Sequence, residues 1–398
     1  MGSQGVSNEN ISLRLNASET KGKIITCKAA VAYGPGEPFV VEQIHVKPPQ
    51  KSEVRIKILY TSICHTDLSG WLGENEAQRA YPRIFGHEAS GIVESVGEGV
   101  KDIEEGDIVI PIFNGECGSC SYCKSDKTNM CESFGVNPMK KVMENDGSSR
   151  FSTIDGKPIF HFMNTSTFVE YTVVHSACVV KLQHDLSHSL KKLTLISCGV
   201  STGVGAAWNS ANVHSGSSVA VFGLGAVGLA VAEGARSRGA SKIIGVDINP
   251  DKFIKAQAMG ITDFINPRDE EKPVHERIKE ITGGGVDYSF DCAGNINVLR
   301  EAFLSAHRGW GLTVILGVHA TPELLPFHPM ELFDGRRIIG SVFGGFKGKT
   351  QLPHFAKECI HGVVRLDNFI SHELPFEEIN KAFDLLTNGK SIRCILNM

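Results

Sequence analysis

Four cysteines lie close together between residues 117 and 131, in the pattern Cys117-x-x-Cys120-x-x-Cys123 followed after seven residues by Cys131. Four thiolates at this spacing can form a closed tetrahedral shell around one zinc ion, which leaves no position for a substrate. We therefore interpret the cluster as a structural zinc site. Free surface thiols and an iron–sulfur cluster remain alternatives. A nucleic-acid zinc finger is disfavoured because the segment lacks a His pair and a basic helix.

A second pattern, Gly223-Leu-Gly225-Ala-Val-Gly228, lies between an apolar strand pattern and a helical pattern. The glycines permit a tight turn and close backbone approach, and the helix N-terminus would face a pyrophosphate. Asp247 ends the next strand pattern, where a carboxylate accepts hydrogen bonds from the adenosine ribose and repels a 2′-phosphate. The pattern predicts a dinucleotide site that takes NAD in preference to NADP; a glycine turn without a ligand is the alternative.

A third group consists of residues far apart in the chain. Gly86-His87-Glu88 lies 23 residues after Cys64, and Cys198 lies in an apolar stretch before the glycine pattern. Two thiolates and one imidazole would leave a fourth zinc position open, as in catalytic zinc sites. Spacing alone does not pair such distant ligands, so an ordinary core histidine is the competing interpretation.

Two kinds of secondary-structure pattern would position these residues. Short alternating runs at 54–60, 91–97 and 106–113 predict an antiparallel, barrel-like domain. From about Ser217, six apolar strands alternate with helical stretches, which predicts a doubly wound parallel sheet. Those strands are Val219–Phe222, Lys242–Asp247, Thr262–Ile265, Asp287–Asp291, Leu312–Val318 and Arg337–Phe343. The closing segment, 344–398, carries a helix pattern and a strand at 392–396 that could complete either domain.

Length and composition agree with an α/β protein of two domains. The chain has 398 residues, of which 41% are hydrophobic and 21% charged. A net charge of −4 without a Lys/Arg stripe argues against a nucleic-acid partner. Eleven cysteines, an odd and unevenly spaced set, favour metal chemistry in a reducing compartment over disulfides.

Two stretches bear on membranes and targeting. Met1 to Thr20 contain no apolar run typical of a signal peptide, which predicts a cytoplasmic protein. Leu193 to Ala232 contain no Asp, Glu, Lys or Arg, but Gly, Ser and Asn residues and His214 interrupt the run. We therefore predict a buried strand and turn region there, and no membrane span.

Six motifs together resemble the zinc-dependent medium-chain alcohol dehydrogenases, in the same order along the chain. They are Cys64-His-Thr-Asp, Gly86-His-Glu, the four-cysteine cluster, Cys198-Gly-Val-Ser-Thr-Gly, Gly223-Leu-Gly-Ala-Val-Gly and Gly245-Val-Asp-Ile-Asn. The likeness runs from about Cys27 to Met398 and is strongest to the plant alcohol-dehydrogenase-like branch. The first twenty or so residues lie outside it and are expected to be loosely ordered.

The resemblance assigns the catalytic zinc to Cys64, His87 and Cys198, with the fourth place left to the oxygen of an alcohol or aldehyde. Glu88 matches the acidic neighbour of the zinc-binding histidine; the alternative is a buried carboxylate paired only for structure. A second, structural zinc is expected in the four-cysteine cluster.

The resemblance also implies a proton route. Thr66 matches the hydroxyl that bonds the alcohol oxygen and passes its proton toward the nicotinamide ribose. Where the animal enzymes continue this route with a histidine, this chain has Ser69. A serine hydroxyl is not a base near pH 7, so the proton would leave through water, through another group or not along this path.

The remaining assignments by resemblance concern the cofactor and the substrate. They are Asp247 and Lys252 for the adenosine ribose, Thr202 and Val227 for the nicotinamide, Phe343 for the cofactor, and Arg393 and His65 for the pyrophosphate. His65 stands where many relatives have arginine, and because an imidazole binds phosphate less strongly, faster NAD release is expected. Phe113 aligns with an aromatic residue of the substrate pocket, and Trp71 is a further candidate.

The implied architecture is a barrel-like (GroES-like) catalytic domain, 1–199 and 343–398, with an inserted dinucleotide-binding (Rossmann) domain, 200–342. The implied activity is hydride transfer between NAD(H) and a primary alcohol or aldehyde. Alternatives are an NADP(H)-using reductase of a bulky aldehyde and a catalytically silent binding protein. A zinc-independent quinone reductase would be expected to lack Cys64, His87 and the four-cysteine cluster. Relatives pair as homodimers, for which 312–342 would supply the edge.

Overall fold

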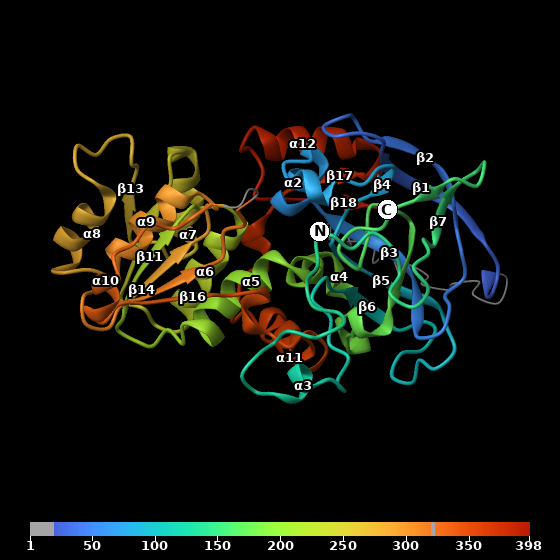
Figure 1. Cartoon of the computed structure of the whole chain (residues 1–398), viewed down its shortest axis with the longest axis horizontal. Helices are drawn as coiled ribbons and strands as arrows, with labels where there is room; N and C mark the ends of the chain where they lie inside the picture. The colour runs from blue at the N-terminus through green and yellow to red at the C-terminus, as the bar shows by residue number, and fades with distance from the viewer. Residues whose placement is uncertain (1–19, 320–322) are drawn as a thin grey trace, which may run out of the picture.

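The computed structural model describes residues 20–319 and 323–398. The predicted loose order of the N-terminus falls on residues 1–19, outside the described residues. Two groups of elements lie beside one another in Figure 1: a sheet with its helices on the left, and antiparallel sheets on the right. The right-hand group contains both the first half of the chain and its last strands.

The left-hand group is built on a six-stranded sheet in the spatial order β13-β12-β11-β14-β15-β16, with every neighbouring pair parallel. This order confirms the doubly wound sheet. The chain reverses its direction of strand addition at β11, and ligands of such sheets bind at that point, beyond the carboxyl ends of the strands. The strands are β11 (Ser218–Phe222), β12 (Lys242–Val246), β13 (Asp263–Ile265), β14 (Tyr288–Asp291), β15 (Leu312–Ile315) and β16 (Arg337–Gly340).

Helices connect these strands. The glycine turn leads directly into α6, and the strand of Asp247 leads through a short turn into α7, as predicted. The helices are α6 (Ala226–Ser237), α7 (Phe253–Ala258), α8 (Val274–Thr282), α9 (Ile296–Ser305) and α10 (Met330–Phe333).

The last two strands of this sheet end three residues earlier than predicted. After β15 the chain leaves the sheet toward Gly317, and after β16 it turns at Phe343, whose φ of 52° is incompatible with a strand. Apolar residues continue through both points, so hydropathy alone does not mark the strand ends.

The right-hand group contains two sheets whose buried residues join a hydrophobic core that continues into the parallel-sheet group. One has the order β4-β1-β2-β7-β8; the other has the order β10-β6-β5-β3-β18-β17, with β9 also paired to β3. The strands of the first half are β1 (Ile25–Ala32), β2 (Val40–Val46), β3 (Glu53–Ser62), β4 (Arg83–Ile84), β5 (Glu88–Val96), β6 (Ile108–Pro111), β7 (Phe151–Thr153), β8 (Pro158–Ile159), β9 (Tyr171–His175) and β10 (Val179–Lys181).

The end of the chain returns to this second sheet. β18 (Arg393–Asn397) pairs antiparallel with β3, and β17 (Ile370–Pro375) pairs parallel with β18. The structure thereby resolves what composition left open, because the closing strand completes the antiparallel group and not the parallel sheet. The residue bounds of the two predicted domains stay a prediction.

The prediction for Leu193–Ala232 is partly wrong, because much of this uncharged stretch is helical. It contains α5 (Gly199–Gly205) and the wider turn η5 (Ala206–Ser210) before β11 and α6. A Cβ at Gly203 would lie 2.3 Å from the Val227 carbonyl oxygen, so α5 and α6 pack with their backbones nearly touching. Glycines that resemble turn residues in the sequence serve here for close helix packing.

The remaining helices cover the antiparallel sheets and the junction between the two groups (Figure 1). They are α2 (His65–Leu72), α3 (Ser121–Lys124), α4 (Leu190–Leu193), α11 (Gly348–Ile360) and α12 (Ile379–Thr387). Among the described residues, no helix is both long and apolar enough to cross a membrane.

Candidate active site and zinc-binding lobe

Cys64, His87 and Cys198 meet at one point, together with Glu88. One possible ligand atom of each residue lies within 4.8 Å of the others, and all four residues are buried. Spacing could not pair these residues, because their sequence separations are long. The fold brings them together as a single donor group of two sulfurs, one imidazole and one carboxylate.

Three element boundaries produce this convergence. Cys64 follows β3 and is the N-cap of α2, while His87 immediately precedes β5, the antiparallel neighbour of β3. Cys198 is the N-cap of α5, and the amide of Ala89 in β5 bonds the Ser197 hydroxyl at 3.1 Å. Each donor therefore lies at the end of a rigid element, where its side chain is free to face the others.

Asp67 orients the imidazole, a role that we did not assign from the sequence. Its Oδ1 lies 2.8 Å from His87 Nδ1 and accepts the Gly86 amide, while Oδ2 accepts the Cys64 amide at 3.0 Å. A carboxylate bonded to one ring nitrogen favours the tautomer that leaves the other nitrogen as a metal ligand. The sequence does contain one signal for this role. Asp67 lies three residues after the N-cap residue Cys64, the position from which an acidic side chain commonly bonds the N-cap amide.

Arg393 neutralises the other carboxylate. Its guanidinium donates to both oxygens of Glu88 at 2.9 Å, and the Gly199 amide donates to Glu88 Oε1 at 3.1 Å. Because these donors occupy both oxygens, the two sulfurs and the imidazole are the better candidates for metal ligands. Arg393 is itself only 3% exposed, and its predicted contact with a pyrophosphate stays a prediction.

The surrounding charges favour a thiolate. The pKa of the Cys64 thiol is lowered by a hydrogen bond with the neighbouring Cys198 thiol and by the positive charges of Arg393 and His87. Arg393 Nη2 lies 3.3 Å from the Cys64 sulfur. Burial works to lower the pKa of Arg393, but Glu88 and Cys64 outweigh it and raise that pKa. The arginine therefore stays charged and stabilises negative charge on sulfur.

The donor set fits a zinc ion. Zinc prefers cysteine sulfur and imidazole nitrogen, and sites with three protein ligands leave a fourth position for substrate. His87 Nε2 is buried without a hydrogen-bond partner in the described part of the chain, which is rare for a polar atom. A metal ion on Nε2 would satisfy it.

Aromatic rings enclose the imidazole. The Phe113 ring lies 5.7 Å from the His87 ring at 86°, and the Phe343 ring lies 5.2 Å from Phe113 at 76°. Phe162, which the sequence did not single out, lies 6.1 Å from the His87 ring on another segment. The predicted pocket residue Phe113 and the predicted cofactor residue Phe343 are therefore neighbours.

The other predicted residues of this region lie on α2. Thr66 Oγ1 is 4.0 Å from the Cys64 sulfur, and Ser69 follows one helical turn later. Trp71 stacks on Phe39 at 5.7 Å and donates its indole N–H to the Glu37 carbonyl at 2.6 Å. That packing accounts for the Trp71 side chain without a substrate, so its pocket role stays a prediction.

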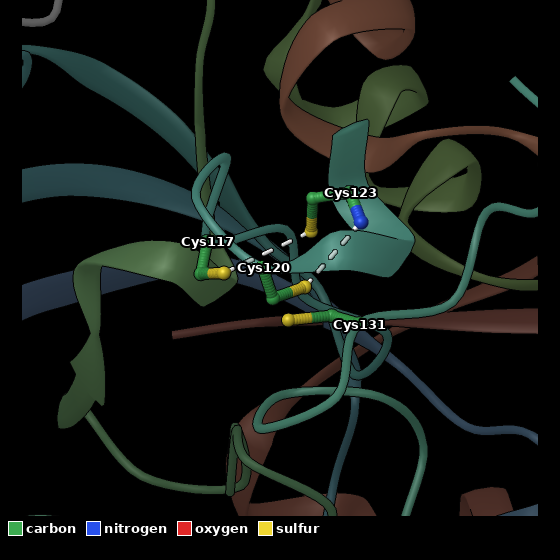
Figure 2. A group of neighbouring side chains, drawn as sticks. All are labelled: Cys117, Cys120, Cys123 and Cys131. Atoms are coloured by element: carbon green, nitrogen blue, oxygen red, sulfur yellow. Dashed lines mark hydrogen bonds between the residues drawn. The ribbon is translucent and has the colours of Figure 1, made fainter. Parts of the chain in front are cut away.

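The four cysteines of residues 117–131 form a separate group around α3. One sulfur of each lies within 4.8 Å of the others, and Figure 2 shows the four sulfur atoms turned toward one another. The Cys117 and Cys123 sulfurs are 3.8 Å apart, and the Cys123 amide donates to the Cys120 sulfur at 3.3 Å. Hydrogen bonds from the Glu132 and Cys123 amides lower the pKa of Cys120. Four converging sulfurs fit one zinc with a closed shell.

The predicted dinucleotide residues gather at the carboxyl edge of the parallel sheet. Asp247 Oδ2 accepts the Leu224 amide at 2.7 Å and the Lys252 ammonium at 2.8 Å. A Cβ at Gly228 would lie 1.9 Å from the Gly223 carbonyl oxygen, so the turn and α6 pack as closely as glycine allows. At Gly225 an added Cβ meets no atom within 4 Å, which leaves room at the helix N-terminus for a pyrophosphate.

The remaining cofactor candidates lie near this edge or on the neighbouring helices. Val227 is in the first turn of α6, Thr202 is in α5, and both are partly exposed. His65 is exposed at the start of α2, next to Cys64. Their contacts with a cofactor stay predictions.

Two family models match this chain. Residues 50–184 match the alcohol dehydrogenase GroES-like domain, and residues 226–358 match the zinc-binding dehydrogenase model. Alcohol dehydrogenase-like 3 of Arabidopsis thaliana is 67% identical, over 96% of this chain and 98% of that protein. The chain belongs to the zinc-dependent medium-chain alcohol dehydrogenase family. The resemblance seen in the six motifs is thereby confirmed, as is the class of enzyme.

Other family members show the same full-length likeness. Alcohol dehydrogenase 1 of Petunia hybrida is 51% identical, over 96% of this chain and 99% of that protein. Benzyl alcohol dehydrogenase from Acinetobacter calcoaceticus superposes with a TM-score of 0.85 at 28% identity, covering 94% of this chain and 99% of that chain. Family membership implies zinc and a nicotinamide cofactor for this dehydrogenase.

Proposed function

We propose that this dehydrogenase transfers hydride between NAD(H) and a primary alcohol or aldehyde at the site of Cys64, His87 and Cys198. The observation that carries the proposal is the unpartnered, buried Nε2 of His87 beside two cysteine sulfurs. A zinc ion held by these three donors supplies Lewis-acid polarisation of an alcohol or aldehyde oxygen. The aromatic rings of Phe113 and Phe162 enclose the same point and support an apolar substrate.

The chain's own residues divide the remaining work. Asp67 fixes the His87 tautomer, and Arg393 keeps Glu88 paired so that the two sulfurs and the imidazole serve as ligands. We propose that the Thr66 hydroxyl accepts a hydrogen bond from the substrate hydroxyl and relays its proton, releasing its own hydroxyl proton as it takes up the substrate's. Ser69, one turn later on α2, cannot continue as a base, so we propose that water carries the proton onward.

For the cofactor we propose NAD(H). Asp247 directly follows β12 beside the glycine turn, where its carboxylate would accept hydrogen bonds from ribose hydroxyls and repel a 2′-phosphate. We further propose Lys252 at the adenosine ribose, Thr202, Val227 and Phe343 near the nicotinamide, and His65 and Arg393 toward the pyrophosphate. An NADP(H)-using aldehyde reductase is the competing proposal, supported by Lys252, whose ammonium could pair with a phosphate.

The direct test is a panel of primary alcohols and aldehydes of increasing size, assayed with NAD(H) and NADP(H) side by side. We expect turnover with NAD(H), and the size of the best substrate would define the pocket. Better turnover with NADP(H) would support the competing reductase. Cys64→Ala should abolish turnover. Cys27→Ala, which changes a buried cysteine on β1 outside the proposed site, should leave turnover intact. A zinc-loaded protein inactive on every pair would support the catalytically silent alternative.

We also propose two zinc ions per chain and a homodimer in the cytoplasm. The converging sulfurs of the 117–131 lobe support the second zinc. β16 is an edge strand, and large apolar side chains in the neighbouring described residues are exposed, among them Phe333 at 79% and Leu324 at 93%. Such a patch is typical of a surface covered by a partner. All eleven cysteines lie in the described residues as free thiols.

A further inference from the structure

The segment Val342–Phe346 lies between β16 and α11 and carries an unusual residue. Phe343 is 1% exposed and adopts a φ of 52°, a left-handed conformation that bulky side chains rarely take. Such a conformation persists only where the surroundings determine it. The Phe343 ring contacts Phe113, which in turn contacts His87. What holds this segment therefore also shapes the proposed active site.

Asn129, in the loop two residues before Cys131, holds both ends of the segment. Its Nδ2 donates to the Val342 carbonyl at 2.8 Å and to the Phe346 carbonyl at 3.1 Å. In the opposite direction, the Lys347 ammonium donates to the Cys123 carbonyl at 2.7 Å. The four-cysteine lobe and the connecting segment are thus joined by hydrogen bonds from each side.

Asn129 is also connected to the residue that follows Phe113. Its carbonyl accepts the Asn114 side-chain amide at 3.2 Å, and Asn114 directly follows Phe113. The Asn114 side chain itself is buried, with 1% exposed. Asn129 therefore links the backbone neighbours of Phe113 and Phe343 through hydrogen bonds.

We propose that Asn129 is a positioning residue, through which the four-cysteine lobe holds Phe343 and Phe113 in contact beside the catalytic site. The inference rests on the proposed function, because Phe343 is a proposed cofactor contact. It gives the structural zinc a second effect besides stability: an ordered lobe fixes Asn129, and Asn129 fixes the backbone on both sides of Phe343. Weak ordering of the lobe would then appear as weak cofactor binding.

Simple packing does not explain the position of Asn129. Its side chain lines an open cavity of about 720 Å³ together with Met130, Ser341 and Lys347, instead of filling a tight core. Truncation at Asn129 consequently removes two hydrogen bonds and little buried apolar contact. Asn145 offers a matched control, because its Nδ2 also donates to a distant carbonyl, that of Lys51 at 2.7 Å, on an exposed loop.

The experiment compares Asn129→Ala, Asn129→Asp and Asn145→Ala with the zinc-loaded wild-type protein. NADH dissociation constants are measured by fluorescence, steady-state kinetics separate KM from kcat, and zinc is counted per chain. Loss of two hydrogen bonds should weaken NADH binding and raise the substrate KM roughly tenfold, with less change in kcat and unchanged zinc. Asn129→Asp keeps the size but loses the donor, so it should behave like Asn129→Ala.

A second measurement does not depend on turnover. Hydrogen exchange of the amides in residues 341–347 should be faster in Asn129→Ala than in Asn145→Ala. Unchanged exchange, NADH affinity within twofold of wild type, or a wild-type-like Asn129→Asp would each overturn the inference. A wild-type protein that binds no NADH would instead contradict the proposed function, and faster exchange of 341–347 would then still support the positioning role of Asn129.

Discussion

The guanidinium of Arg393 and the carboxylate of Glu88 form a buried ion pair, with Nε to Oε2 and Nη2 to Oε1 distances both of 2.9 Å. The two residues are 305 positions apart in the sequence and meet because β18 pairs with β3, the neighbour of β5. The pair lies directly beside the Cys64 sulfur. It therefore joins the last strand of the chain to the proposed zinc site.

Replacing Arg393 should be costly for stability. Arg393→Met would leave the buried carboxyl group of Glu88 without its ion-pair partner, and removal of one partner of a buried pair costs about 3–5 kcal/mol. Urea unfolding of the zinc-free protein would measure the change in free energy. The exposed Arg268 serves as a control, for which Arg268→Met should cost well under about 1 kcal/mol. Equal effects of the two substitutions would show that the pair is not stabilising.

Asp67 should govern zinc affinity at the proposed catalytic site. Asp67→Asn replaces the carboxylate 2.8 Å from His87 Nδ1 with a neutral amide, and loss of such a partner lowers metal affinity roughly 10–100-fold. Competition with a chelator would measure this affinity. We expect one of two zinc ions to be lost more readily, whereas Asp155→Asn, on an exposed loop, should change neither. If Asp67→Asn and wild type lost zinc to the chelator equally, Asp67 would not govern zinc affinity.

Asp247 should control the choice between NAD(H) and NADP(H). Asp247→Gly removes the carboxylate and frees the Lys252 ammonium, now 2.8 Å from Asp247 Oδ2, for a 2′-phosphate. The ratio of kcat/KM for NADP(H) to that for NAD(H) should rise on the order of tenfold. Adding Lys252→Ala should reverse much of that gain. If the NADP(H)-to-NAD(H) ratio of kcat/KM were unchanged in both variants, Asp247 would not contact the 2′-hydroxyl of the adenosine ribose.

Acid should weaken the ion pairs that Glu233 forms with Arg236 and Arg365. This buried carboxylate on α6 accepts hydrogen bonds from Arg236 and Arg365. Burial works to raise its pKa, but Arg365 and Arg236 outweigh it and hold the pKa below the ordinary value of 4.5. Because the folded-state pKa is depressed, the stabilisation is complete above pH 4.5 and is lost as the pH falls through the folded pKa.

The corresponding measurement is the free energy of unfolding against pH. Glu233→Gln should destabilise the protein by about 2 kcal/mol near neutral pH, and the difference from wild type should shrink below the ordinary pKa of glutamate. The exposed Glu276 has no comparable environment, so Glu276→Gln should leave the profile unchanged. A difference between Glu233→Gln and wild type that persists unchanged into strong acid would contradict the assignment.

Short-range patterns in this chain carried most of the predictable information. The cysteine cluster and the glycine turn are each contained within about one motif, so their spacing alone indicated the chemistry. The six parallel strands could also be predicted, because each is a compact apolar run. Long-range partners could not. Asp67 and His87, or Glu88 and Arg393, meet only through strand pairing, which no spacing rule encodes.

The backbone conformation and packing of single residues could not be predicted from the sequence either. β16 ends at Gly340, and Phe343, three residues later, has a positive φ, although the apolar pattern continues through it. The glycines of α5 resemble turns in the sequence but allow two helices to approach closely. Trp71, a predicted pocket residue, packs on Phe39, and Phe162 lies near His87 without any distinctive motif.

We propose that Cys64, His87 and Cys198 hold a catalytic zinc ion with an open position, in addition to the structural zinc of the four-cysteine lobe. Elemental analysis of pure, active protein and of two variants tests it directly. We predict two zinc ions per chain in wild type, one in Cys198→Ser with activity lost, and two in Cys359→Ala, a change to a buried cysteine on α11. One zinc per chain in active wild-type protein, or two zinc ions and full activity in Cys198→Ser, would contradict the claim.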